Sequence, residues 1–303
     1  PGVALSGGLP QVAREFSTAE SNTTRYSICS PETAQRWCDQ VPPGFLMHVK
    51  ALGAFARGHH DFDKLPRDLR ESLPPHLIIR GDGNQKKTNI YAWPDEKRNE
   101  LWVRFRESID PLLKCSKLGF LIFQFALGFT PNSEGALARL RSLREQLNRR
   151  TYPRVAVEFR DRHWLRGPQL EKTVELCRSL RLSLVAVDEL TSELHSSTRR
   201  GGGVEQTCIR VTAPDDGLIV RIHRRVGKKA HDRMLSADRV DFWARAIMET
   251  RQPGSELGKL RAPLFINIGT DAENGIVLNR SAIVGRLGQL APELAEDCDA
   301  WRR

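Results

Sequence analysis

Short apolar segments, each ending in a charged or amide residue, recur along this chain of 303 residues. Strands that are buried on both faces contain runs of Val, Ile, Leu and Phe without polar alternation, so these segments predict a parallel sheet covered by helices. They lie at 16–22, 45–50, 118–124, 155–160, 184–188, 218–225 and 264–271. Helical patterns separate most of them, and this alternation of strand and helix predicts an α/β fold.

A TIM-like (β/α) barrel accounts for such an alternation in a chain of this length. The apolar content of 40% is enough for one core, so a single domain over residues 1–303 is the simplest interpretation. A complete barrel needs one strand more than the segments supply, because residues 1–10 are too short and too rich in Gly and Pro for a strand. We therefore expect a barrel in which the first strand is lacking or altered.

Two further stretches have clear local signals. Ser30, Pro31 and Glu32 form a strong helix start, because Ser caps free backbone N–H groups, Pro suits the first helical position and Glu suits the positive end of the dipole. We expect this helix to end near Gln40. Residues 57–94 are polar and contain several Gly and Pro, which predicts an insertion of loops and short helices after strand 3, counting the missing first strand.

The formal net charge of +10 favours acidic partners such as nucleic acid or phosphorylated metabolites, although the basic residues are spread along the chain. The six cysteines show no C-x-x-C pair and no Cys/His spacing suited to zinc, which favours a reducing, intracellular compartment. No segment approaches the ~18 apolar residues needed to span a bilayer, so we expect a soluble protein without a membrane partner. The oligomeric state and any cofactor stay unknown.

Functional groups should lie at the C-terminal ends of the strands, as they do in (β/α) barrels. Glu158 and Arg160 are two residues apart on one strand and point to the same side, where they either bind a polar substrate or neutralise each other. Trp164 follows, and its ring can stack on a sugar or base, although core packing is the commoner use of Trp.

A second strand places Arg221, His223 and Arg225 on one face, a pattern that suits a phosphate or carboxylate ligand. The alternative is a basic strand exit that is merely solvated. His223 is also a candidate general acid or base, because imidazole titrates near neutral pH. The other strand ends contribute Glu20, Asn22, Lys50, Gln124, Asp188 and Asp271.

The motifs taken together resemble the DUF72 (YecE-like) family. The segment 16–26 is similar to the family pattern F-N-x-V-E-x-N-S-T-F-Y, and 158–164 is similar to E-F-R-x-x-S-W. Asp188 matches a strand with a single Asp, and His223 and Arg225 match H-G-R, with Arg224 in place of Gly. Nothing before Phe16 reproduces the family's first strand, G-T-S-G-W. The resemblance implies a barrel fold but no reaction, because the family is defined without an agreed activity.

We therefore predict a protein that binds an anionic ligand, bearing phosphate or carboxylate, at the C-terminal ends of the strands. Whether it is an enzyme is left open. The catalytic candidates are Glu158, Asp188 and His223, and the binding candidates are Glu20, Asn22, Lys50, Gln124, Arg160, Trp164, Arg225 and Asp271. A metal held by Glu20, Glu158, Asp188 and His223 is an alternative that the nearby arginines oppose. Two other classes stay open, namely a non-catalytic nucleic-acid-binding protein and a degenerate barrel that acts as a scaffold.

Overall fold

The computed structural model describes residues 8–80, 85–189, 199–200, 206–207, 209–223, 235–269 and 275–299. Parallel strands form two sheets, one with the order β1-β2-β6-β7-β8 and one with the order β13-β12-β9. Their bounds are β1 (Thr18–Ser21), β2 (Leu46–Lys50), β6 (Leu118–Phe125), β7 (Val155–Phe159), β8 (Ser183–Leu184), β9 (Ala186–Glu189), β12 (Leu218–His223) and β13 (Leu264–Gly269). Runs of apolar residues thus became parallel strands, as expected from their burial on both faces.

The two sheets are linked through one stretch of chain. Only Val185 separates β8 from β9, and β8 pairs with β7 while β9 pairs with β12. The strands therefore follow one another from β1 to β13. No backbone pairing joins β13 to β1 within the described residues, so the sheet is not closed. The predicted α/β fold with a parallel sheet is confirmed, whereas closure into a barrel is not found.

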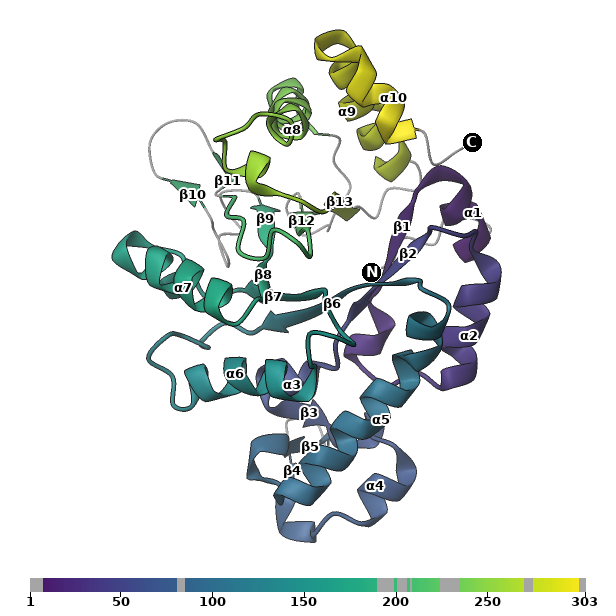
Figure 1. Cartoon of the computed structure of the whole chain (residues 1–303). Helices are drawn as coiled ribbons and strands as arrows, with labels where there is room; N and C mark the ends of the chain where they lie inside the picture. Colours follow the sequence, from purple (N-terminus) through teal and green to yellow (C-terminus); the bar gives the residue numbers. More distant parts are fainter. Residues whose placement is uncertain are drawn as a thin grey trace.

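Helices cover the outside of the sheets (Figure 1). Their bounds are α1 (Gly8–Glu15), α2 (Pro31–Gln40), α3 (Gly53–Arg57), α4 (Arg67–Glu71), α5 (Asp95–Lys114), α6 (Ala136–Gln146), α7 (Gly167–Ser179), α8 (Ala237–Glu249), α9 (Gly275–Leu290) and α10 (Pro292–Asp299). Helix α2 packs against α5, and α9 packs against both α8 and α10. The predicted start of α2 is confirmed, since Ser30 Oγ accepts a hydrogen bond of 3.3 Å from the backbone N–H of Thr33. None of the described helices is long and apolar enough to cross a bilayer.

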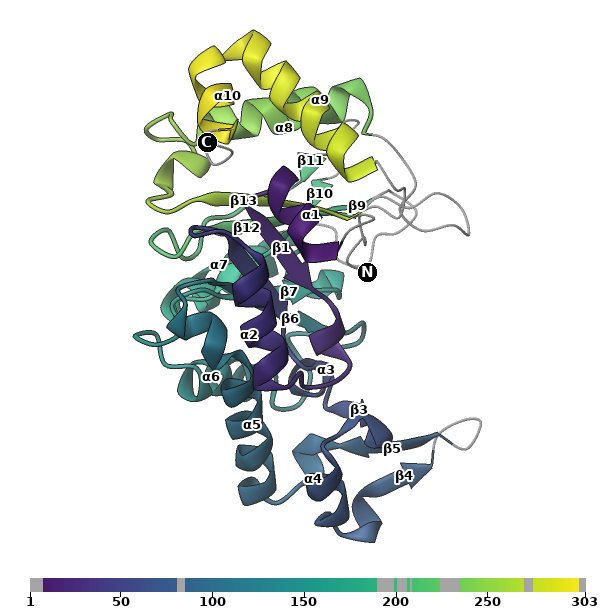
Figure 2. The same ribbon diagram turned by 90° about the vertical axis from the view of Figure 1, so that its right-hand side faces the viewer.

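The insertion at 57–94 has more structure than the sequence predicted. Strands β3 (His59–Asp61), β4 (Ile78–Arg80) and β5 (Lys86–Asn89) form an antiparallel sheet in the order β3-β5-β4. Together with α4 it forms a lobe that projects from the parallel sheets (Figure 2). Trp93 anchors this lobe, because its indole N–H donates to Thr88 Oγ1 at 2.7 Å and its ring is buried. A short antiparallel pair, β10 (Arg199–Arg200) and β11 (Gln206–Thr207), lies elsewhere in the chain.

Cys38 in α2 and Cys115 at the end of α5 form a disulfide across 77 residues of sequence. Nothing in the sequence pattern predicted this pair. Disulfides are rare in reducing compartments, so the pairing does not fit the predicted compartment, which itself stays a prediction. Cys177 is a free thiol in the core, and burial raises its pKa to about 12.

Candidate functional site

The inner face of the strands begins with an apolar layer. Its buried side chains are Phe120, Ile122, Ala156, Val185, Val187 and Ile219, with Phe265 packed against them. His48 joins this layer, and its Nδ1 accepts a hydrogen bond of 2.9 Å from the backbone N–H of Phe120, next to a register shift between β2 and β6. A Cβ on Gly119 would lie 2.5 Å from that Nδ1, so this close approach requires glycine. Burial lowers the pKa of His48 to about 4, and the ring is neutral at physiological pH.

A polar network lies above this layer, one step nearer the C-terminal ends of the strands. Arg221 is its centre, since its Nε and Nη2 donate to the two carboxylate oxygens of Glu20 at 3.1 and 2.8 Å, and its Nη1 donates to Glu158 Oε2. All three side chains are less than 5% exposed. Burial alone would lower the pKa of Arg221, but the charges of Glu158 and Glu20 outweigh it and raise the pKa, so the guanidinium stays charged.

Glu20 also connects the two unpaired edges of the sheets. It projects from β1, whereas Arg221 and Asn267 are partners in the register of β12 and β13. Asn267 Nδ2 donates to Glu20 Oε2 at 2.6 Å, in addition to the two bonds from Arg221. Side chains therefore join β1 to β12 and β13 where no backbone pairing does so in the described residues.

Lys50, the lysine of this network, has a strongly lowered pKa. Its side chain is 7% exposed, and its Nζ lies 3.8 Å from Glu20 Oε1. Burial and the positive charge of Arg221 lower the pKa of Lys50 to about 8, against the opposing effect of Glu20. An amine with this pKa is partly neutral near physiological pH, whereas an ordinary lysine is almost fully charged.

Several polar atoms beside the network have no hydrogen-bond partner among the described residues. Gln124 Nε2 donates to Glu158 Oε1, but Gln124 Oε1 is buried without a partner. The same holds for Asn22 Oδ1 and for Arg160 Nε, which lie just past the ends of β1 and β7. Buried polar atoms of folded proteins are nearly always paired, so these three atoms, at the C-terminal ends of their strands, could bond to a polar ligand.

Positive charge gathers at the same end. Partial burial, followed by the nearby charge of Arg160, lowers the pKa of Arg57 at the end of α3. The two guanidinium groups are therefore close enough to repel each other. Such a pair favours a ligand with a negative charge between them.

Two predicted site residues lie away from this network. Val187 points into the apolar layer, so its neighbour Asp188 points to the opposite face, where it accepts from Arg239 Nη2 at 2.6 Å and from the indole of Trp243 at 2.9 Å. Trp164 is fully buried, stacks on Phe159 with 4.4 Å between ring centres, and packs in the core.

The structure thus brings together Glu20, Lys50, Gln124 and Glu158, with Asn22 and Arg160 next along their strands. Arg225, Asp271 and the side chain of His223 lie outside the described residues. Arg221 and Asn267 were not selected from the sequence. The alternation of charge in 218–225 already placed Arg221 beside His223 on one face, whereas Asn267 had no signal.

A metal centre gains no support from the described residues. No three side chains of His, Cys, Asp or Glu among them converge on one point. Arg221 binds two of the three carboxylates that the metal alternative requires, Glu20 and Glu158, and a guanidinium there opposes a cation.

Fold and site together define an α/β protein with a buried charged network at the C-terminal ends of parallel strands. A family model described as "Protein of unknown function DUF72" matches residues 1–277, and the chain belongs to this family. The UPF0759 protein YunF of Bacillus subtilis is 24% identical over 225 residues, which are 74% of this chain and 64% of that protein. This chain therefore matches slightly less than two thirds of the length of that relative.

Solved structures support the same fold. A DUF72 family protein from Enterococcus faecalis V583 aligns with a TM-score of 0.67 at 17% identity, over 96% of this chain and 95% of that one. A DUF72 family protein from Thermotoga maritima MSB8 aligns with a TM-score of 0.57 at 19% identity, over 93% of this chain and 86% of that one. At such identities the likeness concerns the fold alone.

Proposed function

We propose that this protein binds an anionic small molecule, bearing phosphate or carboxylate, at the C-terminal ends of its strands in an incomplete barrel. One observation carries the proposal. The buried Nε of Arg160 has no partner among the described residues, and this guanidinium lies near Arg57. Guanidinium groups bind phosphate and carboxylate with paired, charge-assisted hydrogen bonds. The acceptor Asn22 Oδ1, past the end of β1, suits hydroxyl or amide groups of the same ligand.

Lys50 adds a group whose charge changes near neutral pH. When protonated, it adds a positive charge close to Glu20. When neutral, it can accept a proton, the property required of a general base. A catalytic role for Glu158 or His223 stays a prediction, whereas the contacts of Asp188 favour a structural role.

The buried network also weighs against the scaffold alternative. Removing charges from water costs several kcal/mol per ion unless good partners compensate. A protein that had lost its ligand could replace the network of Glu20, Glu158 and Arg221 with apolar side chains at no loss of stability. Its intact hydrogen bonding favours a retained site.

The test compares Arg160→Gln with Arg162→Gln, a matched control because Arg162 is exposed and two residues away. Citrate and inorganic phosphate serve as probes in calorimetric titrations of the full chain at pH 7. We expect at least one probe to bind, Arg160→Gln to weaken it about tenfold or more, and Arg162→Gln to change it less than twofold. Equal effects of both variants, or no binding of either probe, would overturn the proposal.

A further inference from the structure

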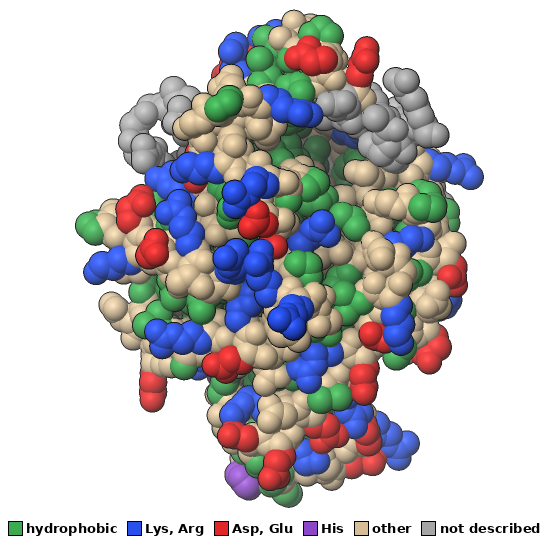
Figure 3. Space-filling view, in the orientation of Figure 1, with side chains coloured by type: hydrophobic (Ala, Val, Ile, Leu, Met, Phe, Trp, Pro, Cys, Tyr) green, Lys and Arg blue, Asp and Glu red, His purple; other side chains and the backbone are tan. Residues whose placement is uncertain are grey.

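A second candidate site lies at the opposite, N-terminal ends of the strands. Basic side chains gather near the middle of the face shown in Figure 3. A pocket of about 620 Å³ lies among the loops that lead into β7, β8, β12 and β13. Its charged lining consists of Arg149, Arg178, Arg181, Lys259 and Arg261 with Asp215 and Asp216, and residues 211–214 complete it.

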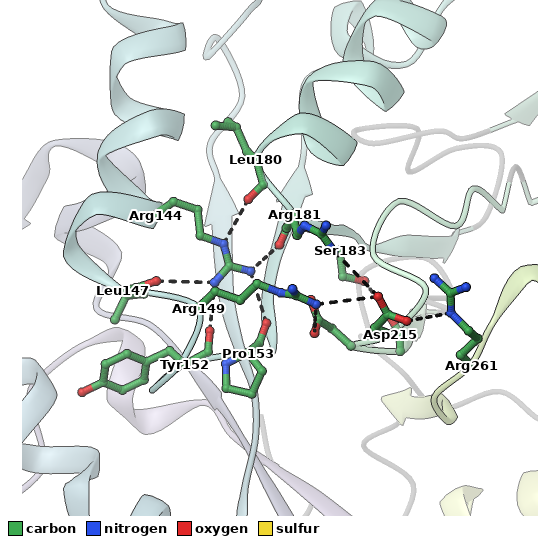
Figure 4. A network of polar contacts seen from close by, with 12 residues as sticks. Arg144, Leu147, Arg149, Tyr152, Pro153, Leu180, Arg181, Ser183, Asp215 and Arg261 are labelled. Atoms are coloured by element: carbon green, nitrogen blue, oxygen red, sulfur yellow. Dashed lines mark hydrogen bonds and ion pairs between the residues drawn. The ribbon is translucent and has the colours of Figure 1, made fainter.

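Asp215 holds three of these arginines toward one point, as Figure 4 shows. Its carboxylate accepts from Arg261 Nε at 2.7 Å and lies 3.7 Å from a terminal nitrogen of both Arg149 and Arg181. These arginines come from three different loops, so no regular surface pattern of one helix explains their meeting. Asp215 and Asp216 together cannot neutralise three guanidinium groups, so donors of these arginines stay available to a further anion.

Arg144 fixes the loops that carry two of these arginines. Its guanidinium donates to the carbonyl oxygens of Tyr152 at 2.8 Å and Pro153 at 3.2 Å, and also to that of Arg181 (Figure 4). Burial lowers the pKa of Arg144 to about 10, yet its donors are used on backbone oxygens. A side chain in this role holds the loops in place before any ligand binds.

The charge balance of the pocket is positive. Asp216 is 5% exposed, one of its oxygens lies 3.5 Å from Arg149, and burial raises its pKa. Lys259 pairs with Glu256, a carboxylate beside the lining, at 2.5 Å. With this third carboxylate counted against five cations, an excess of two positive charges is left. Arg178 has no ion pair with a described residue and supplies one of these charges.

We propose that this pocket binds a small phosphate-bearing molecule. Its volume lies within the range of about 300–1,000 Å³ that is typical of small-molecule sites. Converging arginines are the usual partners of phosphate, because the planar guanidinium donates two parallel hydrogen bonds. A pocket of this volume, bounded by four loops, favours a discrete ligand over a nucleic-acid backbone, which tracks an extended basic groove. This site is independent of the one proposed at the other end of the strands.

The test is a titration of the full chain with pyrophosphate. The double variant Arg178→Gln/Arg261→Gln removes two lining cations, whereas Arg141→Gln removes an exposed arginine of α6 outside the lining. We expect the double variant to weaken pyrophosphate binding at least tenfold and Arg141→Gln to change it less than twofold. Because the site at Arg160 also suits phosphate, the comparison is repeated in the Arg160→Gln background, where the affinity of this pocket should be retained and still fall in the double variant. This separates the two proposals.

Three results would overturn the inference. Pyrophosphate that does not bind, or binds with the same affinity to the double variant, removes the site. A loss in Arg141→Gln about half as large, in binding free energy, as that in the double variant would match the one and two charges removed and show that net charge alone attracts the probe. A third result is that a 20-base-pair DNA binds tightly, that the double variant loses this binding, and that pyrophosphate binds weakly at best. This result would assign the surface to nucleic acid instead. Circular dichroism and thermal unfolding check that each variant is folded.

Discussion

The substitution Arg221→Met should destabilise the fold more than any other single change in the network. Arg221 is 3% exposed, and it makes three hydrogen bonds to the carboxylates of Glu20 and Glu158, which are 4% and 1% exposed. Methionine keeps much of the volume but leaves both carboxylates without their main cation. Breaking a buried pair by removing one partner costs about 3–5 kcal/mol.

The remaining partners set the expected value within that range. Glu20 keeps Asn267 and the ammonium of Lys50 at 3.8 Å, and Glu158 keeps Gln124. We therefore expect a loss of about 3 kcal/mol in the free energy of unfolding at pH 7, at the lower end of the range. Urea denaturation followed by tryptophan fluorescence measures this loss.

The triple variant Glu20→Gln/Glu158→Gln/Arg221→Met separates charge from packing. Neutral amides remove the uncompensated charges, so this variant should recover most of the lost stability. A loss of less than about 1 kcal/mol in Arg221→Met, as small as that of a typical surface substitution, would refute this prediction. A triple variant that is no more stable than the single one would refute it too.

Three further predictions concern Asp188, Lys50 and the disulfide. Asp188→Asn should cost about 3 kcal/mol because it removes the buried carboxylate charge that accepts from Arg239, and it should leave citrate and phosphate binding unchanged. Folding lowers the pKa of Lys50 from the ordinary 10.5 to about 8. Below pH 8 the lysine is charged in both states, and burying that charge lowers the stability of the fold. As pH rises above 8 the folded protein loses this proton first, so the cost disappears progressively. Wild type should therefore gain about 2 kcal/mol relative to Lys50→Met between pH 8 and 9.5. Reducing the disulfide between Cys38 and Cys115 should lower stability by about 4 kcal/mol, given its span of 77 residues.

Each of these predictions has a result that contradicts it. Weakened binding in Asp188→Asn with unchanged stability would return Asp188 to the site. Parallel stability curves of wild type and Lys50→Met above pH 8 would mean that the lysine titrates normally. If a reductant destabilises Cys38→Ala/Cys115→Ala as much as the wild type, the disulfide contributes nothing to the stability of the fold. The mass of the intact protein after alkylation counts the free thiols directly.

The sequence predicted the strands well because a strand that is buried on both faces is a run of apolar residues. Runs such as 118–124 and 155–160 have almost no polar residues before their ends, and each became a parallel strand. The insertion was harder. Its antiparallel sheet pairs His59 with Asn89, and such short polar strands have neither apolar runs nor clear alternation.

The sequence predicted that the site residues lie at the ends of strands, but it did not predict which face of the sheet each side chain points to. Glu158 was recognised from its place at a strand end, but Asp188 has the same kind of place and points the other way. A shift of one residue reverses the face, and the sequence does not say which of Val187 and Asp188 points inward. Contacts between residues that are far apart in the sequence are equally hard to predict. Cys38 meets Cys115 only because α2 packs on α5.

Glu20 shows why stability and binding are coupled at the candidate site. In a closed barrel, backbone hydrogen bonds would join the first and last strands, so no inner side chain would be needed to hold them together. Here the carboxylate of Glu20 bonds to Arg221 and Asn267 across the unpaired edges of β1 and β13. Changing either partner therefore loosens the sheet and alters the site together. Arg160 takes no part in that contact, so its substitution tests binding without this second effect.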